Sequence, residues 1–372
     1  MRTRPLTAAR PTDLHRVTPV GRVTLQTIAD QVGVSRMTVS NAFSRPDQLS
    51  ASLRDRILDA ATQLGYVGPD PAARALARGT TGTVGVLLTS SLQYAFDDDV
   101  ATGFLAAVAE ELGPTGLAIT LLSSTTVGDV IPARDVAMDG ALVYSCEPHL
   151  SGVEWLGRRG LPVVYADEEP DEQISCVNVD DRGGARAAAQ HLVDLGHRDI
   201  AILTAADGVA TGVLADPLAD AQHTKFVSRQ RLVGYLEVLR PAGITPVVHR
   251  QAHSIDDEAY AAALTLLARP GRPTGVLCFS DVIAHGVVRA AEELGLDVPR
   301  DLSVIGFDDS PLARRLRPQL TTVHQDVREK GRLAAAALRV ALEHRSAGTT
   351  GPVEQVVLPT ELVVRDSTAP PS

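Results

Sequence analysis

The sequence predicts a small all-α head followed by a larger two-lobed α/β body built on doubly wound parallel sheets. Residues 23–66 show apolar positions at helical spacing, interrupted by short turns. From residue 83 onward, short apolar runs typical of buried strands alternate with Ala-rich helical segments. With 372 residues, 44% of them hydrophobic, the chain is long enough for more than one core. We therefore expect a head at 23–66, a linker at 67–82 and a body at 83–365.

Residues 23–43, VTLQTIADQVGVSRMTVSNAF, have the features of a helix-turn-helix. Thr24 can cap a first helix over 25–32, Gly33 is placed for a left-handed turn, and Ser35 can cap a second helix over 36–43. A helical hairpin without any DNA-binding role would show the same spacing. If the hairpin does bind DNA, five outward side chains of the second helix can reach a base edge or a phosphate: Arg36, Met37, Thr38, Ser40 and Asn41.

A third helix should complete the head, starting at Ser50 or Ser52 and reaching Leu64 before Gly65 ends it. The linker at 67–82 contains structure-breaking residues and then a short Ala-rich helix that Asp70 can cap. Fewer than two helical turns are rarely stable alone in water. We therefore expect the linker helix to fold together with a partner.

The body should contain parallel strands joined by helices, with ligands bound at the carboxyl ends of the strands. About 280 residues exceed one comfortable sheet, so two lobes with a cleft are expected. The stretch 205–226 resembles an irregular connection. We expect a disordered arm at 1–22 and a disordered tail at 366–372. The strands are expected at 83–89, 117–123, 140–145, 162–166, 199–204, 274–279 and 302–307, and the helices near 98–112, 150–160, 181–195, 228–241, 256–268 and 281–295.

The charge is distributed unevenly along the chain. Residues 1–80 contain 11 arginines and 6 aspartates, for a net charge of +5, whereas the whole chain carries −10. This asymmetry favours a DNA-facing head on an acidic body. Residues 23–80 carry only +1, so charge supports the interpretation without deciding it.

The composition also excludes several classes of protein. Three cysteines without metal or redox spacing indicate a reduced cytoplasmic protein. No apolar run is long enough to span a membrane, and the N-terminus lacks the apolar core of a secretory signal. We expect no cofactor and no metal, since His191 and His197 have no cysteine or carboxylate set to complete a site.

The chain resembles the LacI/GalR family of bacterial transcriptional regulators over residues 23 to about 365. Beyond the hairpin, the resemblance rests on motifs in a fixed order: LGY at 64–66, RALA at 74–77, HLVDLGHRDIAIL at 191–203, RQRLVGY at 229–235, FSDVIAHG at 279–286 and DLSVIGFDDSPLARRLRPQLTTVHQD at 301–326. It implies a homodimer that binds a pseudopalindromic operator in double-stranded DNA, most often as a repressor.

The resemblance also assigns roles to the head and linker. Arg36, Met37 and Asn41 fall where the family reads bases, and Leu76 is the side chain wedged into the minor groove, with Ala73 beside it. The remaining hydroxyl residues match phosphate contacts: Thr24, Ser35, Thr38 and Ser40.

The body is similar to periplasmic sugar-binding proteins, in which two lobes close over a small ligand. This similarity implies an effector, most simply a sugar, held by carboxylates and an arginine against an apolar wall. Asp167, Arg231 and Asp308 match family ligand positions, although Arg231 and Asp308 can instead form a structural pair. Residues at other strand ends extend the expected wall: Tyr94, Phe96, Asp97, Phe279, Ser280 and Asp281. Tyr94 and Phe96 suit plain packing equally well, and Asp281 can instead cap the helix that follows it.

Two other functions compete with a ligand-responsive regulator. A cytoplasmic sugar-binding protein would share the body, but residues 23–78 argue against it. A sugar-processing α/β enzyme is the other alternative, yet the sequence has no GxGxxG after a strand, no P-loop and no GxSxG. The pair Asp308–Asp309 suggests acid/base chemistry, but a cleft carboxylate beside a helix cap also explains it. We therefore expect no enzymatic activity.

Overall fold

The computed structural model describes residues 23–68, 70–88, 92–124, 128–145, 151–206, 210–222 and 224–372. The chain divides into two compact units at residues 81 and 82. The expected arm at 1–22 lies outside the described residues. Among the described residues, no helix is both long and apolar enough to cross a membrane.

The head is a three-helix domain, as the sequence predicts. It consists of α1 (Leu25–Val32), α2 (Arg36–Ser44), a short 3-10 turn (Pro46–Gln48) and α3 (Ala51–Gln63). The Thr24 side chain caps α1, Gly33 adopts a φ of 77°, and the Ser35 side chain caps α2 by accepting a hydrogen bond from the Thr38 amide. The head core is apolar and includes Ile28, Val39 and Ile57. These local signals confirm the predicted helix-turn-helix.

The linker contains α4 (Pro71–Arg78), which follows the predicted pattern closely. The Asp70 side chain accepts hydrogen bonds from the amides of Ala72 and Ala73, and Gly79 ends the helix with a φ of 71°. Leu76 is 87% exposed. That α4 folds together with a partner remains a prediction.

The first lobe of the body is a six-stranded parallel sheet in the order β12-β5-β4-β3-β1-β2. The strands are β1 (Thr83–Leu88), β2 (Ala118–Ser123), β3 (Gly140–Tyr144), β4 (Val163–Ala166), β5 (Ser175–Val179) and β12 (Gln355–Leu358). The helices are α5 (Leu92–Asp97), α6 (Asp99–Leu112), α7 (Pro132–Asp135), α8 (Ser151–Arg158) and α15 (Val327–Ser346). Helices α6 and α15 share one apolar core with the sheet, and α7 and α8 pack in a second core.

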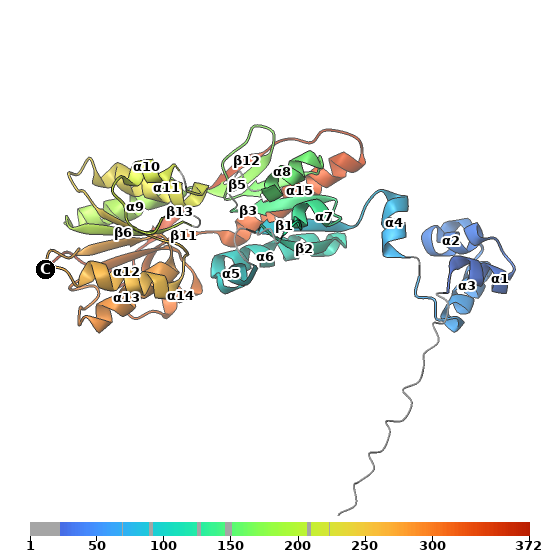
Figure 1. Cartoon of the computed structure of the whole chain (residues 1–372), viewed down its shortest axis with the longest axis horizontal. Helices are drawn as coiled ribbons and strands as arrows, with labels where there is room; N and C mark the ends of the chain where they lie inside the picture. Colours follow the sequence, from blue (N-terminus) through green and yellow to red (C-terminus); the bar gives the residue numbers. More distant parts are fainter. Residues whose placement is uncertain are drawn as a thin grey trace, which may run out of the picture. The chain divides into compact units, whose positions relative to one another are not determined.

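The second lobe is a seven-stranded sheet in the order β13-β11-β10-β9-β6-β8-β7, parallel except for β13 and β7. The strands are β6 (Ile200–Ala205), β7 (Gly212–Val213), β8 (Val247–Gln251), β9 (Gly275–Cys278), β10 (Ser303–Asp308), β11 (Thr321–Gln325) and β13 (Thr360–Val363). The helices are α9 (Asp181–Asp194), α10 (Pro217–Ala221), α11 (Phe226–Leu239), α12 (Asp256–Leu267), α13 (Asp281–Glu293) and α14 (Pro311–Arg315). Helices α9 and α11 cover one face and α12 and α13 the other, which confirms the doubly wound prediction (Figure 1).

The chain crosses between the two lobes three times. Asp180 separates β5 from α9, Asp326 separates β11 from α15, and Pro359 separates β12 from β13. Each crossing therefore contains a single residue between two regular elements. The stretch 205–226, expected to be irregular, contains the short elements β7 and α10.

The predicted disorder of residues 366–372 is wrong. Ser367 is fully buried, and its hydroxyl donates to the Val304 carbonyl at 2.6 Å and accepts from the Thr321 amide at 2.8 Å. His191 Nε2 lies 3.0 Å from the Thr368 hydroxyl, and His197 Nε2 lies 2.9 Å from the Ala369 carbonyl. The two histidines thus hold the tail against the second lobe. Disorder was predicted from the composition of the tail, which does not show that the folded lobe supplies these polar partners.

Candidate functional site

The side chains expected to contact DNA lie on accessible parts of the head and linker. On α2, Arg36 is exposed and Met37 is 68% exposed, whereas Thr38, Ser40 and Asn41 are half-buried. The Asn41 amide donates to the Gln48 side chain at 3.2 Å. Four further residues expected to contact DNA are also exposed: Thr24 and Ser35 in the head, and Ala73 and Leu76 on α4.

The body contains a cavity of about 340 Å³ between its two lobes. The cavity lies at the carboxyl ends of strands from both sheets, where a doubly wound fold places its ligands. Tyr144 ends β3 and Asp167 follows β4 in the first lobe, whereas Phe279 follows β9 and Asp308 ends β10 in the second. The predicted position of the cleft is therefore confirmed.

Arg231 of α11 organises the second-lobe wall of the cavity. Its side chain is 5% exposed, and its Nε donates to Asp181 Oδ1 at 2.7 Å. Nη1 donates to the Phe279 carbonyl at 2.6 Å and to Asp308 Oδ1 at 3.3 Å. The guanidinium also lies 3.6 Å from the centre of the Phe307 ring. One cation is thus shared between two carboxylates and stacked on an aromatic ring, an arrangement that suits arginine better than lysine.

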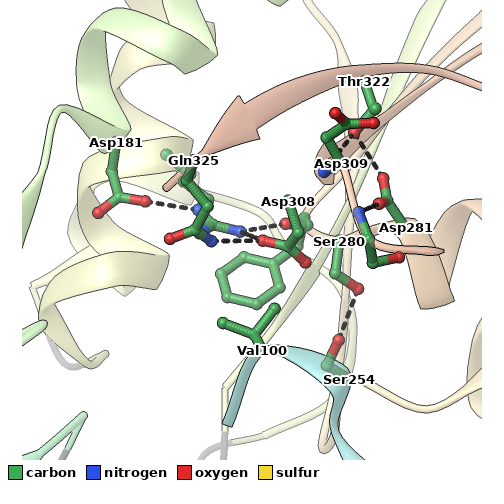
Figure 2. Close-up of polar contacts among 12 residues, drawn as sticks. Val100, Asp181, Ser254, Ser280, Asp281, Asp308, Asp309, Thr322 and Gln325 are labelled. Carbon is green, nitrogen blue, oxygen red and sulfur yellow. Dashed lines mark hydrogen bonds and ion pairs between the residues drawn. The ribbon is translucent and has the colours of Figure 1, made fainter. Parts of the chain in front are cut away.

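Burial dominates the protonation of these carboxyl groups. It raises the pKa of Asp308 well above its usual value and that of Asp181 to about 6, although Arg231 opposes both shifts. Asp181 and Asp308 raise the pKa of Arg231 against the opposing effect of its own burial. Gln325 adds a neutral donor, since its Nε2 donates to Asp308 Oδ1 at 2.7 Å (Figure 2).

The first-lobe wall depends on a buried ion pair between Asp167 and Lys330. Lys330 Nζ donates to Asp167 Oδ2 at 2.5 Å and to Gln325 Oε1 at 3.1 Å. Because Gln325 accepts from Lys330 through Oε1, its amide nitrogen faces Asp308. Asp167 has a positive φ of 59°, and its Oδ1 is buried without a hydrogen-bond partner in the described part of the chain. The lysine therefore links cavity-lining residues of both lobes.

Most of the residues predicted to bind a ligand line this cavity, but two do not. The lining includes Tyr94, Asp97, Asp167, Arg231, Phe279, Ser280 and Asp308. Phe96 lies outside it and is 59% exposed, because its neighbour Ala95 faces inward on α5. Asp281 is completely buried behind the wall, where it accepts hydrogen bonds from the Thr322 hydroxyl at 2.5 Å and the Ser310 amide at 2.7 Å (Figure 2).

The alternative role of Asp281 as a helix cap is also wrong. The Ser280 hydroxyl caps α13 by accepting from the Ile283 amide at 3.2 Å, and it lies 2.7 Å from the Ser254 hydroxyl (Figure 2). Burial raises the pKa of Asp281 to about 7. Asp309 likewise caps no helix, because it pairs with Arg365 and Arg314 while Ser310 precedes α14.

Sequence reasoning missed several residues of the wall. Asp98, Ser254 and Gln325 line the cavity, and Lys330 lies directly behind it. Asp98 could have been found from the sequence, because an aspartate at the start of a predicted helix is a typical helix cap. In the structure its side chain caps α6 by accepting a hydrogen bond from the Val100 amide at 2.9 Å. The others become neighbours only through tertiary folding.

Comparison with known proteins places this architecture in a family. Residues 24–68 match the lacI family of bacterial regulatory proteins, and residues 189–368 match the periplasmic binding protein-like domain. An HTH-type transcriptional regulator of Mycolicibacterium smegmatis is 37% identical over 369 residues, covering 95% of this chain and 98% of the relative. The chain belongs to the LacI family of bacterial regulatory proteins.

Solved structures agree with this LacI-family assignment. The transcriptional regulator CelR in complex with cellobiose is 29% identical, with a TM-score of 0.66, and the match covers 93% of this chain and 100% of CelR. The lac repressor dimer bound to operator and the anti-inducer ONPF is 25% identical, with a TM-score of 0.71 and coverage of 94% and 100%. This LacI-family protein is therefore a DNA-binding transcriptional regulator whose body has the periplasmic-binding-protein fold. The relatives named here are regulators, not enzymes.

Proposed function

We propose that this LacI-family regulator is a homodimeric repressor whose operator affinity is set by a small sugar or sugar derivative held in the body cavity. The observation that carries the proposal is the cluster of Arg231, Asp308 and Asp167 at the cavity between the lobes. Carboxylates and a guanidinium hold paired hydroxyl groups through charge-assisted hydrogen bonds, while the aromatic face of Phe279 suits the apolar side of a sugar ring. Cellobiose in the CelR complex supports this class of effector.

On the DNA side, α2 enters the major groove and α4 the minor groove at the centre of a pseudopalindromic operator. Arg36, Met37 and Asn41 read bases, and Leu76, with Ala73 beside it, is wedged between base steps. The exposure of Met37 and Leu76, two large apolar side chains, supports these roles. Phosphate contacts come from Thr24, Ser35, Thr38 and Ser40. The lac repressor dimer on its operator supports the dimeric arrangement.

Coupling between the two sites follows from differential affinity. An effector that binds one arrangement of the lobes more tightly shifts the protein toward that arrangement and changes its affinity for the operator. By linkage, operator DNA changes effector affinity by the same factor. This reciprocity separates a regulator from a plain solute-binding protein.

The test is binding of the purified full-length protein to the DNA upstream of its own gene, at several salt concentrations, with and without sugars and nucleosides. A DNA fragment of equal length without the pseudopalindrome is the control. We expect tight binding to the pseudopalindrome that changes at least tenfold with one class of ligand. Binding that is equally weak on both fragments and disappears with salt would contradict the proposal.

A further inference from the structure

Among the described residues that line the effector cavity, acidic side chains outnumber basic ones. Its charged lining residues are Asp97, Asp98, Asp167, Asp256 and Asp308 against Lys225 and Arg231. Lys330 neutralises Asp167 from behind the wall, and Arg289 pairs with Asp256. Arg231 is shared between Asp308 and the buried Asp181, and burial raises the pKa of both carboxyl groups, so this cluster offers no free cation to an anionic ligand. The described wall therefore presents more acidic than basic side chains to a ligand.

Asp98 adds to this surplus from the first lobe. Its half-buried side chain lines the cavity, with Oδ1 engaged at the N-terminus of α6. Among the residues that the structure describes, no basic side chain forms an ion pair with it. Burial raises the pKa of Asp98, while hydrogen bonds from the amides of Val100 and Ala101 oppose the shift; the charge of Asp99 adds to it and the charge of Lys330 opposes it. A carboxylate in this position favours a ligand that brings positive charge or hydrogen-bond donors.

Asp167 supplies a second, independent observation. The residue is 5% exposed and lines the cavity, and Lys330 occupies only its Oδ2. Its Oδ1 has no donor among the described residues. A buried acceptor without a donor is costly, so an effector that places a hydroxyl or ammonium group there gains affinity.

We propose that the cavity selects a polyhydroxylated effector that carries no negative charge, either neutral or bearing an ammonium group, and rejects phosphorylated and carboxylated analogues. The inference rests on the proposed function and specifies the charge of its effector. A hydroxyl or ammonium group of the effector donates a hydrogen bond to Asp167 Oδ1. Asp98 disfavours effectors with a negative charge. An anionic ligand in this cavity would lie close to carboxylates, and water would screen their mutual repulsion only weakly. This repulsion lowers the affinity for anionic ligands.

The test uses the full-length protein and matched sugars. D-glucose, D-galactose and D-mannose are each compared with their 2-amino-2-deoxy, 6-phosphate and uronic acid forms, and D-ribose with D-ribose 5-phosphate. Calorimetry gives the affinities. We expect the sugars that bind to do so as neutral or amino forms, with phosphates and uronates at least tenfold weaker than their parent.

A phosphate or uronate that binds more tightly than its parent sugar would overturn the inference. If none of these compounds binds, the sugar effector is rejected and this inference with it. Operator binding by the same preparation then still tests the regulator separately, so the two failures are distinguishable.

Asp98→Asn tests the assigned residue, with Asp99→Asn as the matched control. Asparagine caps a helix as well as aspartate does, so α6 should be retained. Asp99 is exposed and does not line the cavity, yet its substitution removes the same charge one position away. We expect the discrimination between a parent sugar and its phosphate to fall at least threefold in Asp98→Asn and to stay unchanged in Asp99→Asn. Equal discrimination in both variants would remove Asp98 from the selection of charge.

Discussion

Replacing Lys330 by methionine should strongly destabilise the body of this regulator. The side chains of Lys330 and Asp167 are 1% and 6% exposed, and Nζ is the donor that the described residues supply to Asp167 Oδ2. Methionine has a similar length and no charge, so it fills the space while leaving the carboxylate unpaired. Since Oδ1 already lacks a partner, both carboxylate oxygens would then be buried without a donor.

Removing one partner of a buried ion pair costs about 3–5 kcal/mol. For a body of this size, such a loss lowers the melting temperature by about 5–15 °C. Arg328→Met on the same helix is the control, because Arg328 is 64% exposed in its pair with Glu110. An exposed pair contributes about 1 kcal/mol or less.

The assay is urea unfolding of the full-length protein, carried out as a double-mutant cycle with Asp167→Asn. We expect each single variant to be destabilised and the double variant to be at least as stable as either one, with a coupling free energy of about 3 kcal/mol or more. The reasoning would be refuted if Lys330→Met lost no more stability than Arg328→Met, or if the two single effects simply added.

Three further predictions concern the operator, the effector and pH. Leu76→Ala should weaken specific operator binding while barely changing non-specific binding, because only the central step is wedged; equal losses in titrations of both DNAs would exclude the wedge. Arg231→Ala should abolish the effector-induced change in operator affinity, since the guanidinium that holds Asp308 is lost; a normal response in operator titrations would remove Arg231 from the site. Asp281→Asn should gain melting temperature relative to the parent as pH rises from 5 to 8. The pKa of Asp281 is raised from 3.8 to about 7 in the folded parent, so the parent loses stability as the pH rises through that interval, because the unfolded chain releases a proton that the folded carboxyl group still holds; a difference that stays constant with pH would contradict this.

The head could be predicted almost to the residue because its signals are local. Thr24, Gly33 and Ser35 each determine a helix end through contacts within a few positions. The body strands were found wherever the sequence is continuously apolar. Six strands were not predicted: β5, β7, β8, β11, β12 and β13. Of these, β5 and β8 carry Asn178 and Arg250, polar residues that are buried but hydrogen-bonded to the carbonyls of Glu168 and Ala210.

The cavity was predicted at the level of strand ends but not of side chains. We expected both Ser280 and Asp281 in the wall, but only Ser280 lines the cavity. At the start of α13, neighbouring side chains point in different directions, and the sequence does not show which of the two faces the cavity. Lys330 could not be predicted because its helix, α15, was not recognised and its partners lie 163 and 5 positions away. Lys330 lies close to Gln325 because β11 passes through Asp326 directly into α15.

The three single-residue crossings restrict how the lobes can move. They are adjacent, since the Asp180 amide donates to the Leu358 carbonyl at 2.9 Å, and Gln325 of β11 is paired with Thr360 of β13. Three short tethers along one edge resist sliding and separation but permit rotation about the line that joins them. We therefore expect an effector that favours one arrangement of the lobes to change the angle between them. The linker to the head enters the body at β1 of the first lobe, so a rotation of that lobe by a few degrees displaces the origin of both α4 and the DNA-binding helices.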